Sequence, residues 1–383
     1  MPLRPVALSV ALQIGVPRQA VVIAAGVLAV LLTIEILLTL GYSVVKSNRQ
    51  KRQTPIRESL RDELLTRLYR PAAPEWEQWV ESLSEEQRAV LEALLDEYLR
   101  ELDGADATQL AALGEALGIT QRAHRHLKHG SYTDRLQALT WLALLQDAPA
   151  IEVLKEHCTG TPKERAAAVR VLHESGHPEI GRIGIDLLLS DNPKPFSIFG
   201  VDTLYRAAEK DPSHLFERAA ADFVDWEPQL QQQVLLSCRY LRTLVGDAEL
   251  SWLVEALNSP AERTRAEALK TLGGFGWHPT LLEGIDLQSL VNDSSPLVRT
   301  SAYQMFGEWG DETAIDLLRF AGMADPNARA RVAAARALIA YDGEYDFSIP
   351  DQLAAWSWAA EQASYDAVVR DISAEATMTG GSS

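Results

Sequence analysis

The densest cluster of potentially reactive side chains in the sequence lies within one short segment. It comprises Arg122, His124, Arg125, His126, Lys128 and His129. Imidazole groups one helical turn apart, as at His126 and His129, can bind a metal ion. No carboxylate or thiolate lies among them, however, and three neighbouring cations oppose metal binding. We therefore predict no metal site, and the cluster either contacts an anionic lipid or an acidic partner, or forms a solvated turn.

The two cysteines and one glycine-rich segment could also take part in chemistry, but their positions in the sequence predict structural roles. Cys158 and Cys238 lie 80 residues apart in predicted helices, so we expect two small core residues and no disulfide or metal site. The glycine-rich segment 273–276 resembles a phosphate-binding loop, but it follows a predicted helix where such a loop would follow a strand. It is predicted to be a turn. No catalytic group and no cofactor site can be assigned from these residues.

Residues 20–45 form a long apolar segment near the N-terminus. As a helix with a rise of about 1.5 Å per residue it would reach about 39 Å, more than the ~30 Å hydrocarbon core of a bilayer. It ends in basic residues and has no small-residue cleavage site, so we predict a membrane anchor and not a signal peptide. Five positive charges follow it and two precede it, which places the following chain in the cytoplasm and residues 1–19 on the other side.

Glu35 lies inside this apolar segment, where an ionisable side chain costs roughly 2.5 kcal/mol or more. Ala24, Leu28 and Leu31 share its helical face. Two interpretations are open. Either Glu35 is protonated or reaches the cytoplasmic headgroups, or its face packs against the transmembrane helix of a partner.

Charge is distributed unevenly along the 383 residues. Residues 1–57 carry +6 and the remaining 326 residues carry −23, which together give the net charge of −17. A strongly acidic surface repels phosphate backbones, so nucleic-acid binding through a broad basic face is not expected. Only 8 Lys stand against 28 Arg. Acid excess with few lysines resembles proteins from salt-loving archaea, in which carboxylates retain hydration at high ionic strength.

A helical motif close to Arg-x-x-Ala-Leu-x-x-Leu recurs seven times between residues 135 and 338, with weaker copies at 197–204 and 234–241. We call the small residue at its fourth position the anchor. The anchors are Ala138, Ala168, Gly200, Ser237, Ala268, Ala302 and Ala334. They are 30 to 37 residues apart, a period typical of an α-solenoid. Each motif predicts the first helix of a pair, and the glycines at 176, 246, 276 and 310 predict the turn before the second.

The most regular stretch is residues 294–338. Its Pro296, Val298, Arg299, Ala302 and Gly310 fall where HEAT repeats have their proline, core residues and turn, and the chain resembles the HEAT-repeat (armadillo-like) family from about 130 to 345. The resemblance implies a curved stack of helix pairs whose second helices line a concave protein-binding surface. These motif residues are packing residues, so they specify fold and not function.

Some HEAT-repeat families are enzymes, but this sequence lacks their signatures. Deoxyhypusine hydroxylases bind two irons through several His-Glu pairs, whereas one such pair is present here, His173-Glu174. HEAT-type DNA glycosylases need a basic concave face, which the charge of −23 opposes. HEAT-type bilin lyases have no local signature in this chain and stay a distant alternative. We therefore expect a non-enzymatic protein without a cofactor.

The segments that flank the repeats are predicted to be helical. Ser84 to Gln87 form a capping box at a helix start, and residues 58–130 are interpreted as an irregular helical cap after a basic linker at 46–57. Asp106 is expected to cap the helix that Gly118 closes. After the repeats at 131–345, residues 346–372 form a capping helix, and residues 373–383 are expected to be disordered.

Two tryptophans in the C-terminal capping helix, Trp356 and Trp358, cannot share one helical face. The helix either folds back on the last repeat or docks a partner through one of them. In total the sequence predicts an all-α protein with an α-solenoid behind a single transmembrane helix. The expected function is a membrane-anchored, cytoplasmic scaffold that binds other proteins. The alternative is an accessory subunit of a membrane-embedded enzyme or transporter.

Overall fold

The structure is a computed structural model. It describes residues 26, 28, 32–35, 54–69, 74–190, 193–241, 250–276, 281, 283–310, 312–341, 358, 361 and 365. Within these residues the regular elements are α-helices and one 3-10 turn, Phe223–Asp225. The chain divides into two units, Met1–Gly118 and Ile119–Ser383. The predicted all-α fold is confirmed in this described part of the chain.

The first unit contains a helix over residues 54–68, followed by α3 Trp76–Ser82, α4 Glu85–Glu101 and α5 Gly104–Ala116. Ser84 and Gln87 form the predicted capping box at the start of α4. Gly118 follows α5 with a φ of 68°, a conformation that glycine adopts without strain. Asp106 was expected to cap α5, but the helix starts earlier and Asp106 lies in its first turn. Arg57 pairs with Glu97 of α4.

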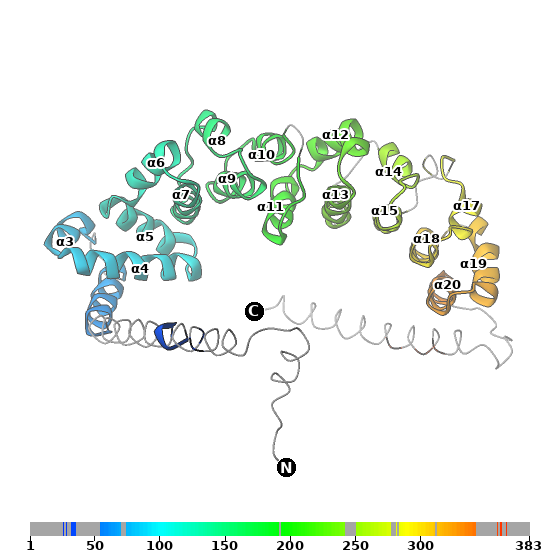
Figure 1. The fold of residues 1–383 in the computed structure, drawn as a ribbon, viewed down its shortest axis with the longest axis horizontal. Helices are drawn as coiled ribbons and strands as arrows, with labels where there is room; N and C mark the ends of the chain where they lie inside the picture. Colours follow the sequence, from blue (N-terminus) through cyan, green and yellow to red (C-terminus); the bar gives the residue numbers. More distant parts are fainter. Residues whose placement is uncertain are drawn as a thin grey trace, which may run out of the picture. The chain divides into compact units, whose positions relative to one another are not determined.

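The second unit is built from two layers of helices (Figure 1). The helices that carry the repeated motif form one layer, which we call the motif layer: α7 Tyr132–Leu144, α9 Pro162–Glu174, α11 Ile198–Ala208, α13 Pro228–Tyr240, α15 Glu262–Phe275, α18 Pro296–Trp309 and α20 Ala328–Tyr341. The other layer, the second layer, contains α6 Ile119–His129, α8 Ile151–His157, α10 Ile180–Leu188, α12 Ser213–Asp222, α14 Ser251–Ala256, α17 Leu287–Val291 and α19 Glu312–Ala324. Successive helices of the motif layer pack along one another in chain order.

All seven anchors are buried, as the repeated pattern of small residues predicts. Ala268, Ala302 and Ala334 are each 0% exposed. Gly200 is the anchor of α11, and a Cβ atom there would lie 2.7 Å from the Cβ atom of Phe196. A larger residue at that anchor would therefore require Phe196 to move. The two weaker motif copies are confirmed as helices of the same layer.

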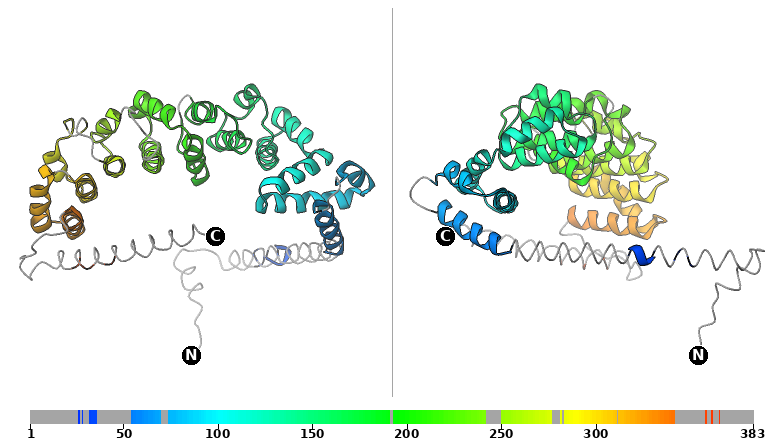
Figure 2. Two further views of the ribbon diagram at one scale, coloured as in Figure 1. Left: turned by 180° about the vertical axis from the view of Figure 1, so that it is seen from behind. Right: turned by 60° about the vertical axis from the view of Figure 1, so that its left-hand side comes forward.

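The pairing of helices differs from the prediction. The motif helix was expected to be the first of its pair, but α20 packs along the preceding α19 much more than α18 does, and α7 packs along the preceding α6. In these two cases the motif helix is the second of its pair, whereas α9 packs more along the following α10 than along the preceding α8. Seen from the front and from behind, the motif layer lies on the inside of the curve within this unit (Figures 1 and 2).

The second unit also starts earlier than the predicted repeats. Residues 119–129 were assigned to the cap, whereas α6 belongs to the second unit because its buried face packs along α7. Gly176, Gly276 and Gly310 have positive φ at helix ends, as predicted. Residues 273–275 are helical and not part of a turn, because α15 continues to Phe275 and ends at Gly276.

Several predicted segments lie outside the described residues: 1–19, most of 20–45, 46–53, Gly246, Trp356 and 373–383. Of the apolar segment only residues 26, 28 and 32–35 are described, and they are helical with Glu35 exposed. Among the described helices, none is both long and apolar enough to cross a membrane. Cys158 and Cys238 are buried free thiols, which confirms them as core residues. Burial raises the pKa of Cys158 to about 11.

Candidate partner-binding groove

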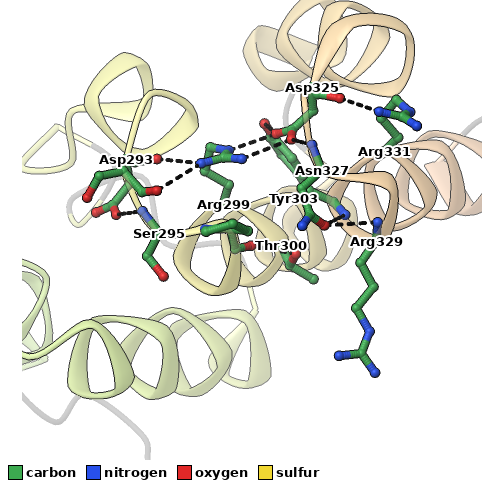
Figure 3. Close-up of polar contacts among 12 residues, drawn as sticks. Asp293, Ser295, Arg299, Thr300, Tyr303, Asp325, Asn327, Arg329 and Arg331 are labelled. Carbon is green, nitrogen blue, oxygen red and sulfur yellow. Dashed lines mark hydrogen bonds and ion pairs between the residues drawn. The ribbon is translucent and has the colours of Figure 1, made fainter.

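We call the first residue of the motif, three positions before the anchor, the ladder position; at α15 and α18 it is an arginine that links consecutive repeats. Arg299 of α18 donates hydrogen bonds from Nε and Nη2 to the carboxylate of Asp325, at 2.8 and 3.0 Å. Its Nη1 donates to the main-chain oxygen of Asp293, at 2.7 Å (Figure 3). Arg265 repeats this pattern on the carboxylate of Asp293, at 2.9 and 3.0 Å. Each arginine therefore binds the turn before the next motif helix.

The Arg299–Asp325 pair is almost completely buried. The side chains are 9% and 2% exposed, and Asp325 also accepts a hydrogen bond from the Tyr303 hydroxyl at 2.9 Å. Burial alone would raise the pKa of Asp325, but the hydrogen bonds from Arg299, from the main chain of Asn327 and from Tyr303 outweigh it and lower the pKa below its usual value. A buried pair with this many partners holds two repeats together. Its role is structural.

The residue two positions after the anchor lies on the other side of the motif helix, and we call it the groove position. In chain order it is occupied by Thr140, Arg170, Asp202, Arg239, Lys270, Gln304 and Arg336. Because the anchor faces the core, a residue about 200° further around the helix faces away from it. None of these seven side chains belongs to the buried class. The groove position is therefore where the motif layer presents side chains to a ligand.

A groove with a volume of about 780 Å³ lies on the last four helices of the motif layer. This volume is in the range of ligand-binding pockets. Its lining includes the groove-position residues of α13, α15, α18 and α20, together with Thr300, Met305, Gly307, Glu308, Arg329, Val332, Ala333, Ala337, Ala340 and Trp358. At its floor α18 and α20 approach closely, since a Cβ atom on Gly307 would lie 2.7 Å from the Cα atom of Ala337. The floor is apolar.

The lining of the groove is cationic, although the chain as a whole is acidic. Arg239, Lys270, Arg329 and Arg336 line it, and Glu308 is the one acidic residue among the described lining residues. Glu267 lies beside them and accepts from Lys270 Nζ at 2.7 Å and from Arg239 Nη1 at 3.5 Å. Over α13, α15, α18 and α20 there are eight Lys or Arg and three Glu, but three of the eight are the ladder-position residues Arg265, Arg299 and Arg331, which bind the turns between repeats. The groove lining is thus basic within a part of the chain, residues 58–383, whose net charge is acidic.

The equivalent positions in α9 and α11 are closed by an ion-pair network. Arg170 Nη1 donates to the Asp202 carboxylate at 2.7 Å and its Nε donates to Glu174 at 2.6 Å. Asp202 also accepts from Arg206 Nε at 3.0 Å. Burial tends to raise the pKa of Asp202, but the hydrogen bonds from the two arginines lower it overall. The cation at the groove position of α9 therefore binds the acid at the groove position of the next motif helix, α11.

The helices that form the groove also match a known protein family in part. A family model described as HEAT repeats matches residues 250–339, which run from the start of α14 almost to the end of α20. This part of the chain is made of HEAT repeats. No curated protein and no solved structure matches the chain. HEAT repeats generally mediate binding between proteins, and they support a protein-interaction scaffold here.

The HEAT repeats do not include the predicted basic cluster, which lies on α6. The buried face of this helix is formed by Ile119, Ala123 and Leu127, so the cluster is spread over the remaining surface. His124 Nε2 lies 2.7 Å from a carboxylate oxygen of Asp147, a partner that comes from outside the segment. Arg125, Lys128 and His129 are exposed. Whether the cluster contacts a lipid or an acidic partner stays a prediction.

Of the two tryptophans predicted to contact a partner, the structure describes one. Trp358 is 48% exposed and lines the groove, whereas Trp356 lies outside the described residues. In the described part of the chain, no group of three or more His, Cys, Asp or Glu side chains is placed to hold a metal ion. Sequence reasoning missed the groove itself. The signal was available at the groove position of successive repeats.

Proposed function

We propose that this protein is a non-enzymatic scaffold, anchored to the cell membrane by residues 20–45, that binds another protein through the groove in its HEAT repeats. The observation that supports this most directly is the cationic groove on α13, α15, α18 and α20. Interfaces of this kind combine an apolar floor with a polar rim, which together give affinity and specificity. No cofactor is part of the proposal.

The membrane part of the proposal rests on the sequence. The apolar segment is long enough to cross a bilayer, and five basic residues follow it. By the positive-inside rule the repeats lie in the cytoplasm, where the groove would meet a cytoplasmic partner or the cytoplasmic part of a membrane protein. Labelling of an introduced tail cysteine by a membrane-impermeant reagent in intact cells would contradict this orientation.

The experiment that tests the scaffold function uses the full chain, purified from its native membrane in a mild detergent. We expect a partner protein to co-purify in a fixed stoichiometry, and the double variant Lys270→Glu/Arg336→Glu to lose it. The matched control is Arg182→Glu/Arg319→Glu. Both control residues are partly exposed arginines on the second layer that form ion pairs, Arg182 with Glu179 and Arg319 with Asp316, and the variant makes the same change in net charge.

A partner that is retained equally by both variants would show that the groove is not its binding site. Absence of any stoichiometric partner would contradict the scaffold function itself. Thermal unfolding followed by circular dichroism verifies that the two variants fold equally well.

One observation favours the second candidate function, an accessory subunit of a membrane-embedded enzyme or transporter. Glu35 places an ionisable group within the apolar segment, and such groups usually face another helix or a polar cavity. If this function is correct, Glu35→Leu releases the integral membrane partner while Lys270→Glu/Arg336→Glu does not. The opposite pattern supports the groove as the main site.

A further inference from the structure

We propose that the groove is a receptor for an acidic segment that carries an aromatic side chain, and that residues 342–383 of the same molecule are its occupant. This inference rests on the proposed function, since it names the chemistry of the partner for the same site. A partner protein then has to displace the chain's own C-terminal segment. It must therefore present a similar acidic and aromatic segment.

Charge complementarity is the first argument. Residues 342–383 contain eight Asp or Glu and one basic residue, Arg370, which gives a net charge of −7. The groove presents four cations and one acid, Glu308, and Arg239 and Lys270 share the carboxylate of Glu267 beside it. In the second layer over the same repeats the charge is reversed, because α12, α14, α17 and α19 contain five acidic residues and two arginines. The acidic segment is thus attracted to the groove face and repelled by the opposite one.

The position of Trp358 is the second argument. This side chain belongs to the acidic segment, with Asp351 and Glu361 on either side of it in sequence, and it lines the groove. Val332, Ala333 and Ala337 of α20 offer an apolar surface on which an indole ring can pack. Guanidinium groups at a groove also favour aromatic faces through cation–π attraction. The groove and the segment therefore match in two independent kinds of interaction.

The chain connection is the third argument. α20 forms one wall of the groove and ends at Tyr341, so the acidic segment begins where that wall ends. Because this segment is covalently attached at the end of α20, its effective concentration at the groove is about 1 mM or more. Even a weak individual affinity then suffices for occupation of the groove. An external partner needs either a higher affinity or several contacts to displace it.

The test is photo-cross-linking in the full-length protein. Trp358 is replaced by p-benzoylphenylalanine, which keeps an aromatic side chain, and the cross-linked peptides are identified by mass spectrometry. We expect intramolecular cross-links from position 358 to α18 and α20. The same probe at Phe320, an exposed position on α19 of the second layer, is the control and should not reach the groove.

Charge reversal in the groove provides the second measurement. Like charges placed in contact are strongly repulsive, so Lys270→Glu/Arg336→Glu should lower the cross-link yield from position 358 by about tenfold or more. Arg182→Glu/Arg319→Glu should leave the yield unchanged. In molar KCl, where the Debye length is about 3 Å, the yield of the unaltered groove should also decrease.

Four outcomes would overturn the inference. Cross-links that avoid the groove, or that persist after charge reversal, would show that the segment does not occupy it. Cross-linked dimers would show that the occupant comes from a second copy of the chain. Displacement of the segment by duplex DNA at lower concentration than by a peptide of residues 342–372 would assign the groove to nucleic acid. In each case the co-purification experiment still tests the scaffold function separately.

Discussion

The two ends of the motif layer use the same repeat position in different ways. In α9 and α11 the groove position holds Arg170 and Asp202, which pair at 2.7 Å. In α18 and α20 the corresponding residues are Gln304 and Arg336, and the surrounding face is basic. An acid at this position turns the preceding cation into a contact between repeats. A neutral residue in its place leaves cations in the lining of a groove.

This difference is possible because stability depends on other residues. The ladder position and the anchor carry the packing of consecutive repeats, and both are buried at α18. The groove position faces outward and contributes little to packing. Within one repeat, structural and binding roles are thus assigned to opposite sides of the same helix, and the predictions below test this separation.

The largest decrease in the free energy of unfolding is expected from a substitution at the ladder position. Arg299→Ala leaves the carboxylate of Asp325 buried without its main partner, and removing one member of a buried pair costs about 3 to 5 kcal/mol. The free energy of unfolding of the full chain should decrease by this amount in urea titrations. Lys270→Ala, which removes a cation from the groove position, should change it by less than about 1 kcal/mol. Equal losses in the two variants would contradict the separation of roles.

A smaller loss is expected when an anchor is enlarged. Ala302 is 0% exposed, so Ala302→Trp should overpack the junction between α15 and α18 and cost about 1 to 3 kcal/mol. Gln304→Trp places the same side chain two residues further on, at an exposed groove position. It should leave the melting temperature almost unchanged. A melting temperature that does not fall in Ala302→Trp would remove this anchor from the core.

The buried Arg299–Asp325 pair also predicts that the stability of the folded protein depends on pH. The pKa of Asp325 is lowered in the folded protein, so its contribution is complete above the unfolded value of about 3.9 and is lost as the pH falls below that value. In Asp325→Asn the decrease in stability between about pH 4 and pH 2 should be less steep than in the native protein. Asp316 is 90% exposed, and Asp316→Asn should leave the slope unchanged. Equal slopes in all three proteins would contradict the role of Asp325.

The repeats themselves were predictable from the sequence because burial imposes a period. All seven anchors were identified from small residues at a spacing of 30 to 37, and the positive φ of Gly176, Gly276 and Gly310 follows from glycine at helix ends. The pairing of the helices was not predictable in this way. A motif helix packs on both neighbours, and an apolar stripe does not indicate which neighbour belongs to its own pair.

The groove was missed because a net charge is a sum over the whole surface. The value of −23 for residues 58–383 hides eight basic residues on four helices that contain three acids. Comparing the groove position from repeat to repeat reveals Arg239, Lys270 and Arg336 directly. The cluster on α6 is apparent in the sequence because its residues are adjacent. Adjacent residues on a helix point in different directions, whereas equivalent positions in successive repeats share one face.

The smallest effects on stability are expected at the groove position itself, where α9 and α11 differ from α18 and α20. Asp202→Asn removes the acid that closes the α9–α11 face, and partly exposed ion pairs contribute about 0.2 to 1 kcal/mol each. We therefore expect a slight decrease in stability and no change in cross-linking from position 358. The reverse change, Gln304→Glu, introduces an acid between Lys270 and Arg336 and should make the two faces alike.

For Gln304→Glu we expect the opposite pair of results. Stability should stay within about 0.5 kcal/mol, because the position is exposed and lies outside the core. The cross-link yield from position 358 should fall about threefold, since one rim charge changes binding by less than about 1 kcal/mol. Thr140→Glu introduces the same charge at the groove position of α7 and should change neither quantity. If Gln304→Glu lowers stability and leaves the cross-link yield unchanged, the groove position of α18 is a packing position and the two ends of the motif layer do not differ in function.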